Sequence, residues 1–452
     1  MRDPVGGEAV ESAGRTVFRH SVMTFGTRIG IVLVNIPTSI LIARLLGVDG
    51  QGAYASATIF PALFAMIGLL SIDAAHTYLL SKGLHPVAEI NGQSALLMLV
   101  LSAILVPAYL VFVALYPGVE TPELRSVLTL AALVVPVLLA KYLSVALLLG
   151  LQRIRWFNAA NMIQAVVLLG LMCVNLFVAR GGPRGAVVAY LVSELSVTLV
   201  AFAMARREVA GKRLFRRPPP GLFRRSVVYG LQGHIGNVLT QFTYRFDMFL
   251  VLSIVGIAGQ GFYSISVLLA EKLSHIPQSV QVVFFPKASS LETEEVNRLT
   301  PRVVRNSLFL TAVAGLVLYL FSRPLLTLFY GTAFLPALRA FRYLIPGIVM
   351  LSIAKILASD FSSRDRRIYY TIATAVALAV NVILCVFWIP RMGIEGAALA
   401  STVAYSLQSV IMLVVFGRLS GRGVLETTIV RGEDFSRYVA IVRGLLGRRR
   451  SP

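Results

Sequence analysis

The stretch Gly47-Val48-Asp49-Gly50-Gln51-Gly52-Ala53-Tyr54 returns 209 residues later as Gly256-Ile257-Ala258-Gly259-Gln260-Gly261-Phe262-Tyr263. In both copies one long apolar run ends and another begins. Three glycines at matched positions permit backbone angles that other residues resist, and a tyrosine closes each copy where aromatic rings favour the water boundary. Each copy therefore predicts a tight turn between two membrane helices.

A second matched pair supports a duplication. Arg184-Gly185-Ala186 opens one apolar segment and Glu395-Gly396-Ala397 opens another, at an offset of 211 residues. Two matches at nearly one offset are typical of a chain built from two similar halves.

Composition places the chain in a membrane. Of its 452 residues 57% are hydrophobic and 14% are charged, which is far more apolar than a soluble domain needs. The apolar runs are about 20 residues long, enough to cross a bilayer as helices, whereas barrel strands are segments of about ten. We expect an all-α polytopic protein with about twelve transmembrane helices in two six-helix bundles. The expected spans are 21–46, 53–81, 93–116, 126–149, 157–179, 185–205, 227–254, 262–285, 306–321, 335–360, 368–390 and 395–417.

The same pattern predicts the domain organisation. A cytoplasmic segment at 1–20 precedes an N-terminal lobe at 21–205, and a C-terminal lobe follows at 227–417. The linker at 206–226 carries eight basic residues and three consecutive prolines, and the tail at 418–452 is also basic.

The distribution of charge decides what the net charge of +21 means. With the N-terminus in the cytoplasm, 29 Lys and Arg residues fall on that side of the expected spans and eight on the other. This is the positive-inside bias, and it predicts that both termini are cytoplasmic. Binding to nucleic acid is not needed to explain the charge.

Polar residues line one face of the first expected helix. Arg28 and Asn35 lie on it with Thr24 and Ser39, at spacings of four and seven. Polar atoms are costly in lipid, so this face should look into a cavity. Asp73 in the second helix is either a charge partner for Arg28 or a residue near the interface.

The seventh expected helix carries the best stripe. His234, Asn237, Gln241 and Arg245 follow at i, i+3, i+7 and i+11 among apolar neighbours, and Asp247 stands close enough to hold or neutralise Arg245. This regularity favours a site inside the bundle.

Charged residues in the later helices extend this set. The eighth helix has Glu271 with Lys272 beside it, and the tenth has Lys355. Apart from Arg44, Arg339, Arg342 and Glu395 near the outer ends of the spans, five cations and five acids lie within them, so the interior is not clearly cationic. The full sets are Arg28, Lys141, Arg245, Lys272 and Lys355 against Asp73, Glu194, Asp247, Glu271 and Asp360.

Six helices in each half are an even number, so both halves enter and leave on the same side. The halves are then parallel repeats related by an axis along the membrane normal. Pairs of such bundles enclose a central site and expose it to either side in turn, which predicts a transporter.

Several motifs resemble one family of transporters. They are Ala43-Arg44-Leu45-Leu46-Gly47 with Gly50-Gln51-Gly52-Ala53-Tyr54, then Tyr244-Arg245-Phe246-Asp247, Gly261-Phe262-Tyr263-Ser264 running on to Pro286, and Gly393-Ile394-Glu395-Gly396-Ala397-Ala398. From residue 20 to 417 the chain looks like a flippase of the multidrug/oligosaccharidyl-lipid/polysaccharide exporter superfamily, in its bacterial polysaccharide-biosynthesis (O-antigen, Wzx-type) branch.

The resemblance implies a V of two lobes in the bacterial inner membrane. It also implies a cavity that faces cytoplasm and periplasm in turn, and a substrate made of an oligosaccharide on polyprenyl pyrophosphate. On this reading Arg28 and Arg245 hold the anionic head, since arginine offers a planar fork to phosphate oxygens. Asn35, Asn237 and Gln241 would contact sugars. The remaining substrate-binding candidates are His234, Lys272 and Lys355, and the candidates for ion coupling are Asp73, Asp247 and Glu271.

Partners follow from the same resemblance: the lipid-linked oligosaccharide and membrane lipids, with H⁺ or Na⁺ and a polysaccharide polymerase as further candidates. No cofactor, metal or catalytic residue is expected, because phosphate-binding glycine loops, metal-ligand clusters and paired nucleophiles are missing from the sequence.

Three alternatives stay open. An ion-coupled drug or cation antiporter of the same superfamily would use buried acids such as Glu271 or Asp73. A flippase for peptidoglycan precursors is a second alternative, although it usually has more helices. A membrane-embedded glycosyltransferase or ligase would need an acidic pair on an outer loop, where Glu120 and Glu123 are the main acids.

Overall fold

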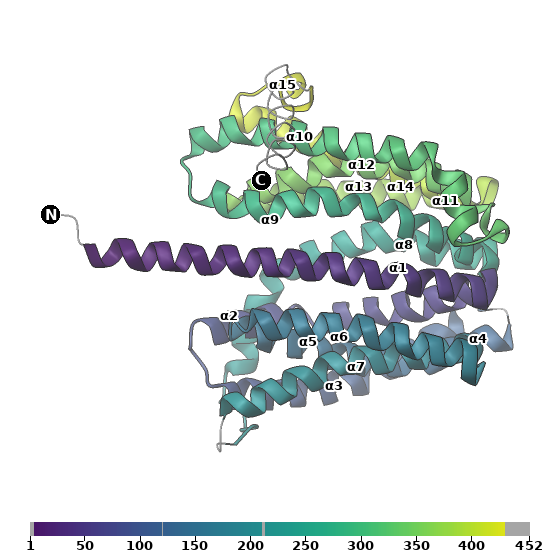
Figure 1. Ribbon diagram of the computed structural model, residues 1–452, viewed down its shortest axis with the longest axis horizontal. Helices are drawn as coiled ribbons and strands as arrows, with labels where there is room; N and C mark the ends of the chain where they lie inside the picture. The colour runs from purple at the N-terminus through teal and green to yellow at the C-terminus, as the bar shows by residue number, and fades with distance from the viewer. Residues whose placement is uncertain (1–3, 120, 210–212, 430–452) are drawn as a thin grey trace, which may run out of the picture. The chain divides into compact units, whose positions relative to one another are not determined.

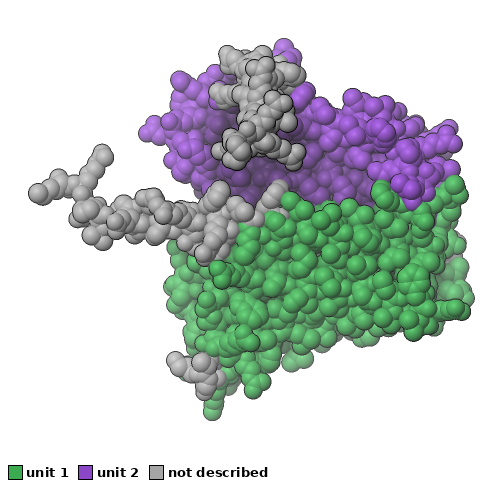
Figure 2. Space-filling model, in the orientation of Figure 1, with its two compact units in different colours: residues 1–241, 251–264, 329–333 green, residues 242–250, 265–328, 334–452 purple. Residues whose placement is uncertain are grey.

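The computed structural model describes residues 4–119, 121–209 and 213–429. Over these residues the chain is helical with connecting turns and contains no strand (Figure 1). The expectation of an all-α polytopic membrane protein is confirmed. Contacts divide the chain into two compact units, which Figure 2 colours separately.

Unit 1 takes in the chain up to Gln241, together with Val251–Ser264 and Phe329–Ala333. Its helices are α1 (Pro4–Gly68), α2 (Ile72–Ser81), α3 (Val87–Leu115), α4 (Pro122–Leu130), α5 (Val134–Gly150), α6 (Ile154–Cys173), α7 (Gly182–Val209) and two parts of α8 (Leu222–Ala270).

Unit 2 takes in Phe242–Leu250, Ile265–Leu328 and the described chain from Phe334 onward. Its helices are the other parts of α8, then α9 (His275–Ser289), α10 (Thr293–Leu320), α11 (Ser322–Phe329, whose last residue belongs to unit 1), α12 (Ala337–Ser363), α13 (Arg367–Met392), α14 (Ile394–Ser420) and α15 (Val424–Thr428). These units are not the predicted lobes, whose boundaries stay a prediction.

Ten helical stretches of the described chain are long and apolar enough to cross a membrane. Two of them, Gly26–Gly68 with 43 residues and Leu222–Ser289 with 68, are long enough for two crossings each at 1.5 Å per residue. Each is broken at the first glycine of a repeat. Gly47 has φ 70° and ψ −171°, and Gly256 has φ 86° and ψ −174°. Ten stretches with two breaks give twelve crossings.

The two glycine repeats pack against each other inside unit 1. A Cβ on Gly52 would lie 2.2 Å from the carbonyl oxygen of Ile257, and a Cβ on Gly261 would lie 2.1 Å from that of Val48. Gly52 matches Gly261 and Val48 matches Ile257 in the duplication, so the contact is reciprocal. Only glycine lets two helix backbones approach this closely.

The structure corrects the expected position of one tyrosine. Tyr263 is fully buried in the protein instead of lying at the water boundary. Tyr54 is partly buried and meets the ring of Tyr190 edge-on at 6.3 Å.

Helix ends differ from the expected spans in several places, and α1 begins at Pro4 instead of 21. The second span, expected at 53–81, is broken at 69–71 between α1 and α2. The ninth begins at Thr293 instead of 306, because Glu292 and Glu295 form a capping box there. Helix α11 (Ser322–Phe329) runs into the expected break at 324–336.

Each unit has an apolar core. In unit 1 one cluster joins α2, α3, α5, α6 and α7 through residues such as Leu79, Ile90, Leu148 and Val197. In unit 2 most of α12 is buried, and it packs against α9, α10 and α14. Cys385 is buried in α13, as expected for a small packing residue.

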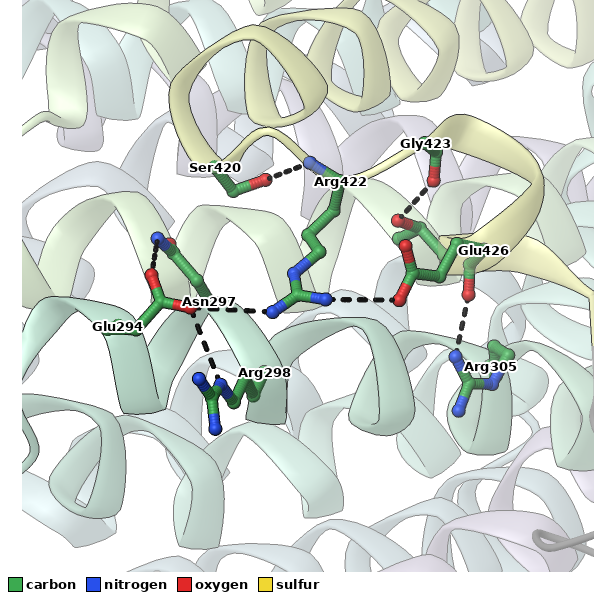
Figure 3. Close-up of polar contacts among 9 residues, drawn as sticks. Glu294, Asn297, Arg298, Arg305, Ser420, Arg422, Gly423 and Glu426 are labelled. Atoms are coloured by element: carbon green, nitrogen blue, oxygen red, sulfur yellow. Dashed lines mark hydrogen bonds and ion pairs between the residues drawn. The ribbon is translucent and has the colours of Figure 1, made fainter.

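The segment after α14 is held on α10 by a polar cluster (Figure 3). Arg422 reaches Glu294 in α10 and Glu426 in α15, both at 3.4 Å. Arg305, which is 6% exposed, donates to the backbone carbonyl of Glu426 at 2.6 Å. These bonds attach α15 firmly to unit 2.

Candidate functional site

The predicted stripe lies on one continuous helix. From Leu222 to Val255 α8 is unbroken, so the spacing of His234, Asn237, Gln241 and Arg245 does place them along one side. The helix contributes to both units: the first three residues belong to unit 1 and Arg245 belongs to unit 2. The two ends of the stripe therefore have different surroundings.

The unit 1 end of the stripe meets a strained turn. Ser71 accepts or donates a hydrogen bond at 3.1 Å with Nδ1 of His234, and Nδ2 of Asn237 donates to the Ser71 hydroxyl at 3.4 Å. Leu70 and Ser71 both have φ 54°, a left-handed conformation that costs about 1–2 kcal/mol for a residue with a side chain. Backbone strain of this kind collects at functional sites.

Close packing holds this turn in place. A Cβ on Gly230 of α8 would lie 2.4 Å from the carbonyl oxygen of Leu70. Behind the turn, Nε2 of His76 lies 3.1 Å from the side-chain oxygen of Gln93, whose amide donates to Ser226 at 3.3 Å. This buried network ties α2, α3 and α8 together.

The unit 2 end of the stripe is an ion pair. Both terminal nitrogens of Arg245 donate to the carboxylate of Glu271, at 2.8 and 3.1 Å. This bidentate geometry is the strong form of an arginine–carboxylate contact. About a quarter of the Arg245 side chain and a third of the Glu271 side chain stay exposed.

Aromatic rings and further cations surround that pair. Lys355 of α12 places its ammonium 5.8 Å from the centre of the Tyr244 ring, which meets Tyr405 edge-on at 5.8 Å. Lys272 follows Glu271 directly and is half-buried. Arg245, Lys272 and Lys355 are thus brought to one region of unit 2 with a single carboxylate, Glu271, bonded to the arginine.

Asp247 is held by hydrogen bonds within α8 and to α14. It is 2% exposed, and it accepts from the Ser401 hydroxyl at 2.9 Å and from the backbone N–H of Met248 at 2.8 Å. These bonds join α8 to α14. The carboxylate that is bonded to the Arg245 guanidinium is that of Glu271.

The candidates in the first two helices are not brought into contact. Arg28 is exposed on α1, Asn35 is half-buried, and the described residues show no ion pair between Arg28 and Asp73. Asp73 lies in the first turn of α2, beside Ser71 of the strained turn. Gln241 is exposed on α8.

The sequence did not predict a third polar group, which lies in unit 1. Nζ of Lys141 in α5 lies 2.5 Å from the carboxylate of Glu194 in α7, and the amide of Gln164 in α6 donates to the same carboxylate at 3.3 Å. The Glu194 side chain is 4% exposed. Each charge of a buried ion pair needs a partner, because an unpaired charge away from water destabilises the fold. The sequence did contain a signal for this group, because each of three otherwise apolar helices carries one of its charged or amide residues.

Comparison with known proteins identifies the family of this chain. The model of the family described as "Polysaccharide biosynthesis protein" matches residues 15–292, more than half of the chain. The chain belongs to the polysaccharide biosynthesis protein family. The resemblance predicted from the glycine repeats and the α8 motif is confirmed, and the matching proteins are transporters by their printed names, not enzymes.

Relatives of the family match over most of their length. A protein of Shigella flexneri described as "Putative O-antigen transporter" is 21% identical over 421 residues, which is 89% of this chain and 98% of that protein. The lipid II flippase MurJ in an inward closed conformation superposes with a TM-score of 0.70 at 16% identity, covering 95% of this chain and 96% of that one.

A multidrug transporter of the MATE family in an inward-facing conformation superposes with a TM-score of 0.68 at 12% identity. The match covers 89% of this chain and 98% of that one. At such identities these two structures show a shared fold. The fold expected from the sequence is therefore confirmed by proteins that share few of its residues.

Proposed function

We propose that this protein is a flippase that moves a polyprenyl-pyrophosphate-linked oligosaccharide from the cytoplasmic to the periplasmic leaflet of a bacterial inner membrane. It works by alternating access, serves the synthesis of surface polysaccharide, and has both termini in the cytoplasm. The charge bias of 29 to 8 supports that orientation.

Membership of the polysaccharide biosynthesis family carries this proposal. The relative described as an O-antigen transporter supports the substrate class, and the lipid II flippase MurJ, which has the same fold, acts by its name on a lipid. Neither comparison identifies the sugars, so the proposal stops at the class of substrate.

The proposed site uses the cations for the anionic head and the amides for sugar. Arginine forks fit pyrophosphate oxygens, which favours Arg245 as the main contact, with Lys272 and Lys355 beside it. Arg28 is a further contact for the head. Hydroxyl groups of the glycan suit amide and imidazole groups, which are those of Asn35, His234, Asn237 and Gln241.

The ion pair adds a link between substrate and coupling ion. Glu271 occupies the fork of Arg245, so a pyrophosphate must compete with this carboxylate. A proton taken up by Glu271 would weaken the pair and release the guanidinium to the substrate. Asp73 and Asp247 remain candidates for ion coupling, although Asp247 is bonded to α14.

Deletion of the gene tests the function. Lipid-linked oligosaccharide should accumulate on the cytoplasmic leaflet, and surface polysaccharide should be lost. Normal surface glycan with new sensitivity to cationic drugs would contradict the flippase and favour an antiporter.

Complementation with variants tests the site. Arg245→Ala should lower export at least about tenfold, since one charge-assisted pair contributes about 1.5–3 kcal/mol. Arg339→Ala is the matched control, because Arg339 is 76% exposed and its contact with Glu395 is 3.7 Å long. The two variants and the unchanged protein should be present in the membrane in equal amounts.

A charge swap separates binding from stability. If the pair only stabilises the fold, the double variant Arg245→Glu with Glu271→Arg should restore export. We expect the swap to restore the amount of folded protein and to leave export absent, because the guanidinium has left the stripe. Full export by the swapped protein would remove Arg245 from the site.

A further inference from the structure

A cavity inside unit 1 has no role in the proposed transport path. It has a volume of about 170 Å³ and lies between α3, α5 and α7, closed on one side by Phe215 from the basic linker. Its wall is mostly apolar, with four polar residues. The lining includes Ala95, Met98, Ala140, Leu143, Leu147 and Phe202, and the polar members are Asn91, Ser94, Ser144 and Thr198.

The linker is fixed over this cavity. The amide of Asn91 donates to the carbonyl of Leu214 at 3.2 Å, and the backbone N–H of Arg216 donates to the carbonyl of Ala88 at 2.8 Å. A Cβ on Gly92 would lie 1.8 Å from the carbonyl oxygen of Arg216. The segment 213–217 is therefore strapped to the first turns of α3.

The cavity opens toward the apolar outer surface. Phe202 and Phe215 lie 6.3 Å apart at its rim and are 44% and 49% exposed. Leu99 of α3 and Leu199 of α7 are also exposed, at 64% and 60%. Apolar side chains exposed within membrane spans face lipid, so a hydrocarbon chain has access to the opening.

The rim is cationic. Arg213, Arg216 and Arg217 belong to the strap and are exposed, and Arg206 and Arg207 end α7 close by in the chain. Some of this charge is already matched: Arg216 lies 3.7 Å from Glu89, and Arg207 stacks 5.3 Å over Trp156. A clear excess of positive charge remains.

One residue in the wall of the cavity has a buried hydroxyl without a partner. The Oγ1 atom of Thr198 is buried and has no hydrogen-bond partner among the described residues. It lies one helical turn before Phe202, thus below the cationic rim. In a glycerophospholipid the ester carbonyls lie between the phosphate and the acyl chains, so they would lie between the arginines and the apolar part of the cavity.

We propose that this cavity is a binding site for an anionic glycerophospholipid. One acyl chain enters beside Phe202, an ester carbonyl accepts from Thr198, and the phosphate lies against the arginines of the strap. About 170 Å³ holds a segment of one chain, since a cavity of about 150 Å³ holds benzene. The site is independent of the proposed transport path.

Native mass spectrometry of the detergent-purified protein tests the site. The probes are dioleoyl phosphatidylglycerol, dioleoyl phosphatidylcholine and a polyprenyl phosphate. One phosphatidylglycerol should stay bound at concentrations where phosphatidylcholine does not. Equal retention of the two phospholipids would overturn the anionic specificity, and displacement of phosphatidylglycerol by equimolar polyprenyl phosphate would overturn the choice of occupant.

Three variants locate the bound lipid. Arg213→Gln with Arg216→Gln should weaken binding about thirtyfold, since each cation near an anionic lipid contributes about 1 kcal/mol. Arg323→Gln with Arg391→Gln removes equal charge from exposed positions elsewhere and should leave binding unchanged. Thr198→Val should weaken binding about fivefold. Ser144→Phe fills the cavity and should abolish binding; retention in a folded Ser144→Phe protein would exclude the cavity.

A second measurement needs no cavity variant. Trp156 and Trp388 are the only tryptophans, and Trp156 packs on the same core cluster as Leu214 of the strap. In a Trp388→Phe protein, a trace of brominated phosphatidylglycerol in excess phosphatidylcholine should quench Trp156. Quenching no stronger than that by brominated phosphatidylcholine would contradict the proposal.

Discussion

The turns at Gly47 and Gly256 have the same backbone conformation, and the two repeats differ in one side-chain hydrogen bond. Both glycines break a helix at positive φ, and Gly52 and Gly261 bring the two copies into reciprocal contact. The amide of Gln51 donates to Ser264 at 3.2 Å. The matched amide of Gln260 is fully buried and has no partner among the described residues.

The reason for this difference is a single residue. Ser264 corresponds to Ala55 in the first copy, and alanine has no hydroxyl to offer Gln260. The contact thus keeps its symmetry in the backbone and has lost it in the side chains. Backbone contact is what the duplication preserved, because no other residue fits where the glycines cross.

The largest effect should come from filling the crossing. Gly261→Leu places a side chain where a Cβ already comes within 2.1 Å of the Val48 carbonyl. Backbone atoms cannot yield as a flexible side chain can, so we expect a loss of about 3 kcal/mol in stability and loss of export. Thermal unfolding in detergent and complementation of the deletion measure the two effects.

The other copy provides the comparison. Gly52→Leu meets the Ile257 carbonyl in the same way and should cost as much. Gly170→Leu is the control, since nothing lies within 4 Å of a Cβ at that exposed position of α6. Unequal losses at Gly52 and Gly261 would show that the contact is not functionally symmetric.

A smaller effect should follow from Gly47→Ala and Gly256→Ala. Alanine has space at both positions, but φ of 70° or 86° with ψ near 180° is a backbone region nearly restricted to glycine, which costs a residue with a Cβ about 1–3 kcal/mol. Each variant should therefore lower the melting temperature by a similar amount and keep the fold. If only one of them destabilises the protein, the two turns do not carry equal strain.

Ser264→Ala should make the second copy resemble the first. Removing the hydroxyl leaves the Gln51 amide buried without its acceptor, which costs about 1–2 kcal/mol. Ser266→Ala is a demanding control, because the Ser266 hydroxyl donates to the Ala337 carbonyl instead. An unchanged melting temperature for Ser264→Ala would mean that the bond contributes no stability.

The smallest expected effect is a gain. Ala55→Ser places a hydroxyl at the position that matches Ser264, where it should accept from Gln260 and stabilise the protein by about 1 kcal/mol. Thermal unfolding of the single and double variants with Ser264→Ala measures it. A loss of stability would show that the space beside Gln260 is too small for the hydroxyl.

Much of this architecture could be predicted from local pattern. Length and hydropathy gave the spans, and the repeated glycines gave the breaks at Gly47 and Gly256. The break at Leu70–Ser71 could not be predicted, because neither residue favours positive φ and the neighbouring sequence continues the apolar run. Packing on Gly230 holds that turn, and packing is not local information.

The residues of the candidate site could be predicted from the sequence, but the contacts between them could not. Arg245 and Glu271 were both singled out, yet their contact depends on how α8 meets the segment after it. Lys141 and Glu194 are 53 residues apart, and nothing in either helix shows that the other lies opposite. Residue type and helical face can be read from a sequence, whereas partners across helices depend on the tertiary fold.

The cluster that joins α10 to α15 also bears on the order of synthesis. Arg305 is buried, and the carbonyl that it binds belongs to Glu426, which is 121 residues later in the chain. At about 5–20 residues per second, the ribosome needs roughly 10 s to supply this partner. The contact between α10 and α15 is therefore among the last in unit 2 to form while the chain is made.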